Sequence, residues 1–462
     1  MSSTYGKVDE CEHVMLEARR KTRKRIAIIA VSLIVLAIIV VGAVLGTMAH
    51  KKSSETVEIK NNGDSISASI KAVCDVTLHK DKCMETFRSA PNASSLNPEE
   101  LFKFAVKITI AEVSKALNAF SSSNDEKSNI TMDACAELLD LTIDNLNNTL
   151  TSSSNGDVTV PELVDDLRTW LSSAETYQET CVETLSPDMK PFGESHLKNS
   201  TEMTSNALAI ITWLGKIADS FTLRRRLLTT ADVEVGFHVG RRLLQSTDLK
   251  KVAHIVVAKD GSGKYRTISR ALKDVPEKSE KRTIIYVKKG VYFENVRVEK
   301  KMWNVVVVGD GESKSIVSGR LNVIDGTPTF KTATFAVFGK GFMARDMGFI
   351  NTAGPSKHQA VALMVSADLA ALYRCTMNAY QDTLYVHAQR QFYRDCTIIG
   401  TVDFIFGNSA AVLQNCRILP RRPMKGQQIT ITAQGPNRFT VKPFIDGGRW
   451  LPATKVPFRS GL

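Results

Sequence analysis

The chain has 462 residues, 43% of them hydrophobic and 23% charged, and a formal net charge of +12. Such a composition is ordinary for a globular protein, and the length allows two or three domains. The positive charge would suit nucleic acid, a membrane surface or an acidic polymer. The apolar amino-terminal segment and the glycosylation motifs of the chain predict that it is exported. Export excludes most nucleic-acid functions, so no nucleic acid is expected among the partners.

An apolar segment lies near the amino terminus. Residues 26–49 are almost wholly apolar and are long enough to cross a bilayer as a helix. Basic residues at 19–25 precede this segment, which predicts a cytosolic tail at 1–25 and a lumenal or extracellular remainder. We expect an uncleaved signal anchor that binds the membrane. A cleaved signal peptide is the alternative, although its apolar core is normally shorter and ends at a small-residue cleavage site.

Glycosylation motifs and cysteines support export. Four Asn-X-Ser/Thr sequons precede residue 230, at Asn92, Asn129, Asn147 and Asn199. Four cysteines in the same part of the chain form two plausible lumenal disulfides, Cys74 with Cys83 and Cys135 with Cys181. These features predict a glycosylated segment that matures in the secretory pathway.

Helical periodicity dominates residues 65–221. Apolar residues recur at helical spacing, as at Leu101, Phe104, Ala105 and Ile108. A capped helix start is expected at Pro98, and Ser-rich stretches at 121–129 and 152–157 read as loops. The pattern predicts an all-α bundle of four or more helices. Because this region carries no convergent histidines or acids, its expected role is to fold, pack or bind a partner.

Two copies of Arg-Arg-Leu-Leu mark residues 222–246 as a linker. The paired basic residues are Arg225 with Arg226 and Arg241 with Arg242. Either pair alone could be solvated charge. Their duplication at a domain boundary favours cleavage by a processing protease, which needs an extended substrate segment.

Short β-prone runs replace the helical pattern after residue 247. They lie at 255–258, 283–287, 304–308, 335–338 and 360–365, with Gly, Asp or Asn between several of them. Helical segments are sparse beyond 267–272, which favours parallel strands joined by turns, coil upon coil. Cys375, Cys396 and Cys416 recur 21 and 20 residues apart and should form one column. We expect a Cys396–Cys416 disulfide because neighbouring coils bring Cα atoms into disulfide range.

Two aspartates one repeat apart are the strongest chemical signal in the chain. Asp382 and Asp403 are 21 residues apart, and Gln359 and Gln381 repeat at a similar period. Stacked on adjacent coils about 4.8 Å apart, two carboxyl groups cannot both ionise at low cost. One should keep its proton while the other stays anionic, and the amides could donate to an oxyanion. Turn capping by both aspartates is the alternative interpretation.

Four motifs in this order resemble those of plant pectin methylesterases with an inhibitor-like pro-region. They are Gly290-Val291-Tyr292-Phe293-Glu294, Gln359-Ala360-Val361-Ala362-Leu363, Gln381-Asp382-Thr383-Leu384 and Asp403-Phe404-Ile405-Phe406-Gly407. The resemblance implies a right-handed parallel β-helix at 247–437, preceded by an inhibitor-like domain at 65–221. It also implies hydrolysis of the methyl esters of cell-wall pectin, without a metal or organic cofactor, and secretion to the cell wall.

The same resemblance implies roles for individual residues. Asp403 would be the nucleophile, and Asp382 would first donate a proton to methoxide and later accept one from water. Gln359 and Gln381 would stabilise the oxyanion. Substrate contacts are expected from Gln359 and from two further residues, Thr329 and Phe404. The expected partners are methyl-esterified pectin and either the chain's own pro-region or another pectin methylesterase.

The chain departs from the family near its end. The family carries an Arg and a Trp in a Leu-Gly-Arg-Pro-Trp motif beyond Asp-Phe-Ile-Phe-Gly, and the motif is missing here. We therefore expect an incomplete β-helix and a divergent tail at 438–462. An alternative function follows: a catalytically silent, truncated product whose helical domain inhibits pectin methylesterases. A lyase or polygalacturonase on the same fold is disfavoured by the Gln-Asp-Thr-Leu and Asp-Phe-Ile-Phe-Gly motifs.

Overall fold

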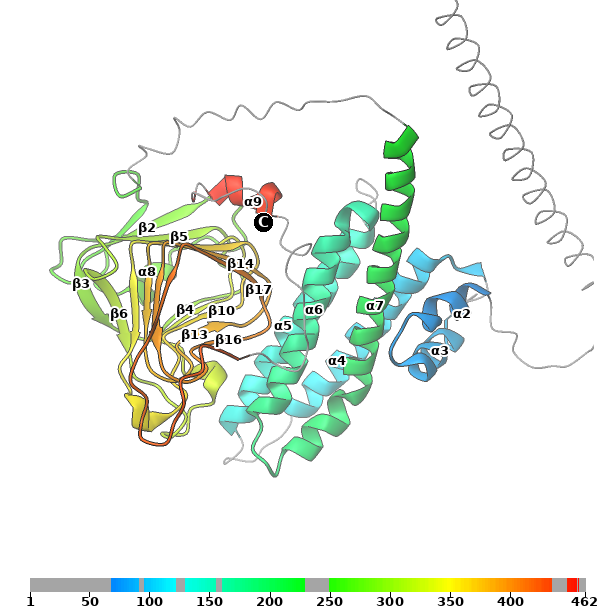
Figure 1. Ribbon diagram of the computed structural model, residues 1–462, viewed down its shortest axis with the longest axis horizontal. Helices are drawn as coiled ribbons and strands as arrows, with labels where there is room; N and C mark the ends of the chain where they lie inside the picture. The colour runs from blue at the N-terminus through cyan, green and yellow to red at the C-terminus, as the bar shows by residue number, and fades with distance from the viewer. Residues whose placement is uncertain are drawn as a thin grey trace, which may run out of the picture. The chain divides into compact units, whose positions relative to one another are not determined.

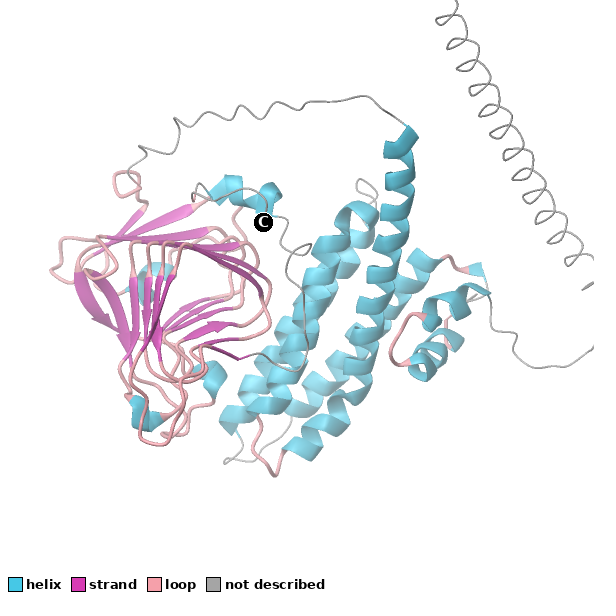
Figure 2. Ribbon diagram, viewed as in Figure 1, coloured by secondary structure: helices cyan, strands magenta, loops and turns pink. Residues whose placement is uncertain are grey.

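A computed structural model describes residues 68–90, 95–121, 129–154, 160–228, 249–433, 447–454 and 456. A helical part is followed by a β-rich part (Figures 1 and 2). The predicted membrane segment at 26–49 and its basic flank lie outside the described residues. Within the described residues no helix is long and apolar enough to cross a membrane.

Six helices form the helical part of the described residues. The four long ones pack in a ring, since α4 contacts α5 and α7, and α6 contacts the same two. An Asn97–Glu100 capping box starts α4: each side chain accepts a hydrogen bond from the other residue's backbone N–H, at 3.0 and 2.8 Å. The helices are α2 (Ala68–Asp75), α3 (Lys80–Arg88), α4 (Pro98–Ser121), α5 (Asn129–Ser154), α6 (Val160–Thr184) and α7 (Lys190–Leu228).

Disulfides and apolar packing hold the bundle together. Cys74–Cys83 joins α2 to α3 and Cys135–Cys181 joins α5 to α6, as predicted. On α4, Leu101, Ala105 and Val113 are buried at helical spacing. The first Arg-Arg-Leu-Leu copy differs from expectation, because α7 continues to Leu228 and this copy forms its last turns rather than a linker. The second copy, with Arg241 and Arg242, lies outside the described residues.

The β-rich part is a parallel three-sheet β-helix. Every strand pairs in parallel with the strand one coil before or after it, and sheets A, B and C form three walls. Sheet A contains β1 (Ile255–Val257), β2 (Thr283–Val287), β5 (Val305–Gly309), β8 (Met343–Arg345), β11 (Ala370–Tyr373), β14 (Arg390–Arg394) and β17 (Ala410–Gln414). Sheet B contains β3 (Gly290–Phe293), β6 (Ser315–Gly319), β9 (Gly348–Asn351), β12 (Thr376–Asn378), β15 (Thr397–Gly400) and β18 (Arg417–Pro420).

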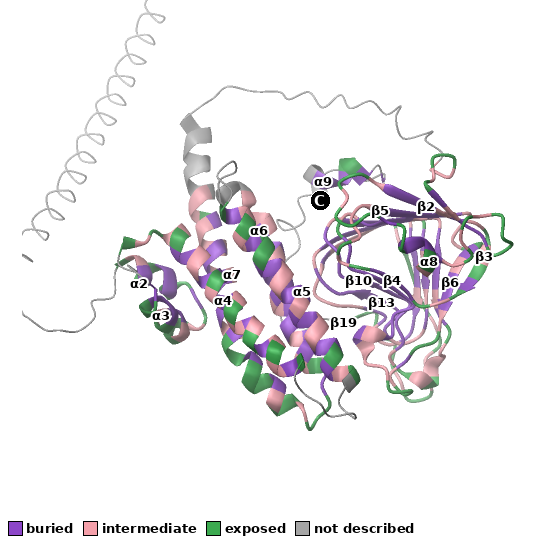
Figure 3. Cartoon of the chain, turned by 180° about the vertical axis from the view of Figure 1, so that it is seen from behind, coloured by how far each residue is buried: buried purple, intermediate pink, exposed green. Residues whose placement is uncertain are grey.

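Sheet C carries the functional region on its outer face. It contains β4 (Val296–Val298), β7 (Phe335–Val337), β10 (Leu363–Val365), β13 (Leu384–Val386), β16 (Ile405–Phe406) and β19 (Thr432–Ala433). Leu363 and Val365 face the interior core, whereas Met364 between them joins the apolar cluster of the helical bundle. Figure 3 colours many strand residues of the β-helix as buried, and the buried apolar ones form a core cluster. The outer face of sheet C is therefore apolar and is covered by the bundle.

Short helices complete the β-rich part. The tail at 438–462, expected to be divergent, includes α9, whose Trp450 and Leu451 pack on the outer face of sheet A beside Val306. The short elements are α8 (Ile268–Leu272), η2 (Thr329–Lys331), η3 (Pro355–Lys357) and α9 (Gly447–Thr454).

Candidate active site

Asp382 and Asp403 occupy the same turn of adjacent coils. The register pairs Leu384 with Ile405, which places each aspartate two residues before a matched pair. Both residues have left-handed backbone conformations, with φ of 61° and 48°. Aspartate tolerates this conformation better than most residues, and here it forms the sharp entry into sheet C. The predicted stacking of the two carboxyl groups is thus matched by the strand register.

The two glutamines form a second column beside the aspartates. Gln359 and Gln381 are paired across adjacent coils, and the backbone N–H of Ala360 donates to the carbonyl oxygen of Gln381. The side-chain Oε1 of Gln381 is buried and has no hydrogen-bond partner. A buried amide oxygen without a partner is costly, so a donor from a bound molecule or a protonated carboxyl would stabilise it.

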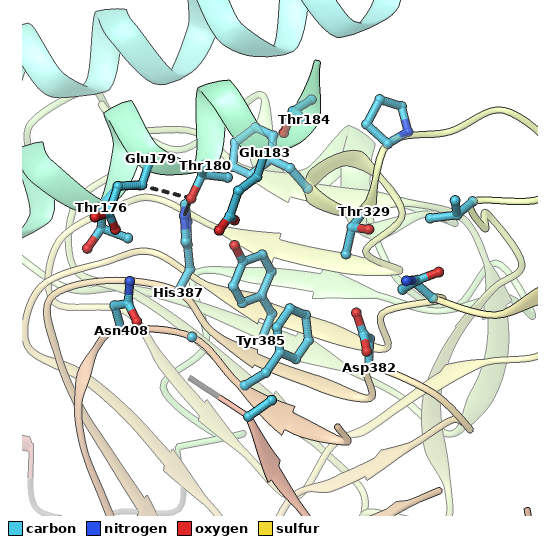
Figure 4. A pocket seen from close by; sticks show the side chains of 17 residues that line it. Thr176, Glu179, Thr180, Glu183, Thr184, Thr329, Asp382, Tyr385, His387 and Asn408 are labelled. Atoms are coloured by element: carbon cyan, nitrogen blue, oxygen red, sulfur yellow. Dashed lines mark hydrogen bonds between the residues drawn. The ribbon is translucent and has the colours of Figure 1, made fainter. Parts of the chain in front are cut away.

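A cavity of about 380 Å³ lies over this part of sheet C. The β-helix contributes Asp382, Gln359 and Thr329 to its wall, together with the rings of Tyr385 and Phe406. Helix α6 closes the opposite side (Figure 4), with Thr176, Glu179, Thr180, Glu183 and Thr184. The cavity therefore joins residues that are about 200 positions apart in sequence.

The surroundings of Asp382 favour the protonated form of its carboxyl group. Burial raises its pKa well above the usual value, and the negative charge of Asp403 adds to the shift. Asp382 is 6% exposed, whereas Asp403 is partly exposed. This difference in environment supports the predicted separation of an acid from an anionic carboxylate.

Asp382→Asn should flatten the pH dependence of stability. Because the folded chain binds the Asp382 proton more tightly than the unfolded chain, this group costs stability as the pH rises from its unfolded pKa of about 4 through its raised folded pKa. Asparagine cannot ionise and avoids that cost. Thermal unfolding followed by circular dichroism from about pH 4 to pH 8 should show a smaller loss of Tm in the variant. Parallel curves for the two proteins would contradict a raised pKa.

Phe404 does not lie where the sequence places it. Its side chain is fully buried in the interior core of the β-helix, packed where Gly400 leaves room. Phe404 precedes β16, and within that strand Ile405 faces the interior while Phe406 faces outward, where its ring stacks on Tyr385 with centroids 4.1 Å apart. The prediction that Phe404 contacts substrate is corrected: Phe406 is the aromatic residue of this motif that lines the cavity.

Phe404→Ala and Phe406→Ala should therefore separate stability from binding. Removing the buried Phe404 ring leaves a cavity, which should lower the free energy of unfolding by about 3–5 kcal/mol in urea titrations. Phe406→Ala should leave stability nearly unchanged but raise KM roughly three- to tenfold, because a ring platform is lost. An effect of Phe404→Ala on KM alone would contradict this assignment.

The cysteine column forms as predicted, but its disulfide does not. Cys375, Cys396 and Cys416 are free thiols on successive coils. The thiols of Cys396 and Cys416 instead approach backbone carbonyl oxygens of Leu372 and Tyr393.

The sequon asparagines are described in part. Asn147 on α5 and Asn199 on α7 are exposed, and Asn129 is the first residue of α5. Asn92 lies outside the described residues. Glycosylation at these positions stays a prediction.

Sequence reasoning missed the polar contacts between α6 and the β-helix. The hydroxyl of Tyr177 lies 2.9 Å from Ser366 Oγ, and Thr180 Oγ1 lies 3.0 Å from His387 Nε2. Nδ1 of His387 lies 3.1 Å from Ser366 Oγ, and burial lowers the pKa of His387 to about 3. A lone histidine gave no signal in sequence, since one of its partners, Thr180, belongs to the helical domain.

An arginine two coils further on contacts the residues that precede Asp382. Arg421 donates from Nη1 to Asn378 Oδ1 at 2.9 Å and to the carbonyl oxygen of Ala379 at 3.1 Å. Its guanidinium lies 4.4 Å from the ring centroid of Tyr380. Within the described residues, no group of three or more His, Cys, Asp or Glu side chains is placed to hold a metal ion.

Two family descriptions match the chain. "Plant invertase/pectin methylesterase inhibitor" matches residues 68–210, and "Pectinesterase" matches residues 254–443. Among solved structures, the pectin methylesterase from carrot is 55% identical, and the match covers 40% of this chain and 59% of that chain with a TM-score of 0.40.

Two Arabidopsis thaliana proteins match over the whole chain. Pectinesterase/pectinesterase inhibitor 24 is 74% identical over 561 positions that cover 100% of each protein. Pectinesterase/pectinesterase inhibitor 46 is 56% identical and covers 99% of this chain and 100% of that protein. Residues 438–462 thus lie within the first alignment, whose length exceeds the 462 residues here by 99 positions. With both domains matched in order, the chain belongs to the plant pectinesterase family as a member with an amino-terminal inhibitor-type domain.

Proposed function

We propose that the chain hydrolyses methyl esters of pectin to pectate and methanol at the Asp382–Asp403 pair. One observation carries the proposal: the two aspartates are in register on adjacent coils, and one of them, Asp382, is buried beside a cavity, which raises its pKa. Family membership gives the reaction class, and the geometry supports the role proposed for each residue.

The proposed reaction starts with attack by Asp403. Its carboxylate oxygen bonds to the ester carbonyl carbon, and the amide groups of Gln359 and Gln381 donate hydrogen bonds to the resulting oxyanion. Asp382 gives its proton to the departing methoxide, which leaves as methanol. Water then attacks the acyl group held by Asp403 while Asp382, now ionised, takes the proton. A free galacturonate carboxyl leaves and both aspartates return to their first state.

Substrate binding is proposed on the cavity wall of sheet C. Thr329 offers a hydroxyl, Gln359 an amide, and the stacked rings of Phe406 and Tyr385 an apolar platform for a sugar face or a methyl group. Asp403 and Gln381 are not on the wall of the cavity that α6 closes. Because α6 closes the cavity that Thr329, Gln359 and Asp382 line, the polymer would have to displace α6 in the full chain to contact these side chains.

A second function is favoured for the helical domain, namely inhibition of the β-helix to which it is joined. Helix α6 covers the cavity. Its Tyr177 contacts Ser366 of the β-helix, and its Thr180 contacts His387. Asp166 of α6 adds a 2.6 Å ion pair with Arg390, which is itself buried beside Asp368. Released by cleavage, the domain could act in the same way on another pectin methylesterase.

Processing and export complete the proposal. Protease cleavage at Arg241–Arg242 is favoured over Arg225–Arg226, because the backbone of the latter pair is helical and a protease needs an extended segment. The two disulfides of the bundle suit the secretory pathway to the cell wall. Residues 26–49 are proposed to anchor the precursor in the membrane before release.

Methanol release tests the proposed activity. Purified full-length protein, intact and after cleavage in the 229–248 segment, is incubated with methyl-esterified and with fully de-esterified polygalacturonate. We expect methanol from the first polymer only, and more of it after cleavage. A folded, cleaved protein that releases no methanol above background would reject the enzyme function and leave the inhibitor function of the helical domain.

A further inference from the structure

Helix α5 carries a stripe of carboxylates on the face that contacts the β-helix. Glu137, Asp140 and Asp144 are spaced at i, i+3 and i+7, which places them along one side of the helix. We call these three residues the acidic stripe. A regular row of carboxylates on a rigid rod resembles, in charge and spacing, a polymer that carries one carboxylate on each sugar.

Each member of the acidic stripe meets a cation of the β-helix. Lys300 Nζ lies 2.6 Å from Asp140 Oδ2 and 2.6 Å from Asp144 Oδ2. The guanidinium of Arg297 and the ammonium of Lys331 both donate to the carboxylate of Glu137. We call Arg297, Lys300 and Lys331 the basic strip.

The basic strip begins at the catalytic cavity. Lys331 is the last residue of η2, whose first two residues, Thr329 and Phe330, line that cavity. Arg297 comes next, on β4, and its guanidinium lies 4.0 Å from the ring centroid of Phe338. The strip is thus continuous with the proposed site of hydrolysis.

A second cavity, of about 300 Å³, lies at the far end of the strip. Its β-helix wall is strongly basic and includes an indole ring, with Lys278, Lys300, Lys301, Lys340 and Trp303. The ammonium of Lys340 lies 5.9 Å from the Trp303 ring centroid. Ammonium groups next to an aromatic face suit an anionic sugar, because the cations meet the carboxylate and the ring meets the apolar sugar face.

These ion pairs contribute little to stability. The side chains of the basic strip are 28–32% exposed and those of the acidic stripe 22–51% exposed, and ion pairs this accessible to water contribute ~0–1 kcal/mol each. Their larger effect is to select the anion that binds to the basic strip. An anionic polymer carries carboxylates that can pair with the cations of this strip as the acidic stripe does.

We propose that the basic strip is a binding site for de-esterified, anionic stretches of polygalacturonate, and that the acidic stripe of α5 occupies it as an intramolecular mimic of that polymer. The inference rests on the proposed function, because it concerns the substrate chemistry of the same groove. It makes the reaction product a competitor of the helical domain: galacturonate carboxylates displace α5 from the strip.

The test uses the full chain cleaved between residues 229 and 248, so that contacts alone hold the helical fragment. Size-exclusion chromatography measures release of that fragment by unesterified oligogalacturonate or by a fully methyl-esterified oligomer of equal length. We expect the unesterified oligomer to act at a concentration about tenfold lower, with the difference lost in high salt. Equal potency of the two oligomers, or no release by the unesterified one, would overturn the proposal.

Variants without the carboxylate charges test whether the acidic stripe holds the helical fragment on the basic strip. Glu137→Gln with Asp140→Asn and Asp144→Asn should weaken retention of the fragment about tenfold and make it less dependent on salt. Asp133→Asn removes a charge from an exposed position of the same helix and should behave as wild type. Equal retention by the triple variant and wild type would overturn the mimicry. If the cleaved protein released no methanol but discriminated the two oligomers, the binding site would stand while the proposed catalysis failed.

Discussion

Asp403→Asn should abolish methanol release, lowering kcat about 10,000-fold or more. The amide has no anionic oxygen to attack the ester carbonyl, and loss of a nucleophile removes the covalent route altogether. The substitution keeps the shape of the side chain and its left-handed backbone, since asparagine tolerates φ near 48° as aspartate does. Activity is measured after cleavage in the 229–248 segment, so that α6 does not mask the result.

Asp382→Asn is the matched comparison. It removes the acid and base but leaves the nucleophile, so kcat should fall about 100- to 10,000-fold, less than for Asp403→Asn. Both variants should keep the far-ultraviolet circular dichroism of the wild type. If Asp403→Asn retained more activity than Asp382→Asn, the two roles would have to be exchanged.

Thr180→Arg should raise the activity of the uncleaved chain about 30-fold or more. Thr180 is 6% exposed, and its Oγ1 lies 3.0 Å from His387 Nε2 at the edge of the cavity. An arginine there would overfill the contact and bring a charge beside the buried, neutral His387, so α6 should leave the groove. A central interface residue of this kind typically contributes ~2 kcal/mol or more, which sets the expected gain.

Ser195→Arg is the control for this effect. Ser195 is exposed on α7, and its hydroxyl donates to the carbonyl oxygen of Phe192 in the same helix. Ser195→Arg adds the same side chain away from the groove and should leave methanol release unchanged. If the wild-type uncleaved chain were already as active as Thr180→Arg, docking of α6 would not inhibit the enzyme.

Local patterns were sufficient to predict several elements. The β-prone runs at 255–258, 283–287 and 335–338 became β1, β2 and β7 within one residue at each end. The Asn97–Pro98 helix start was also right, because its capping bonds are made within four residues. Such features depend on neighbours in sequence, which is why sequence alone predicts them.

The predictions were wrong where the direction of a side chain, or a partner far away in the sequence, determines the structure. Phe404 and Phe406 differ by two positions, but the turn at Asp403 sends the first into the core and the second outward. The Cys396–Cys416 disulfide failed because stacking places Cα atoms in range while keeping the Cβ vectors parallel. The predicted linker, which starts at residue 222, begins too early because α7 continues through Arg225 and Arg226 to Leu228.

The sequence by itself determined the chemistry of this protein: two acids and two amides at a coil-length period, in motifs that identify an ester hydrolase. Periodicity sufficed because a β-helix stacks equivalent positions one strand spacing apart. Only the tertiary structure decided which carboxyl is buried and protonated, and that α5 and α6 cover the groove. Burial and docking depend on contacts between residues hundreds of positions apart, for which no local pattern carries a signal.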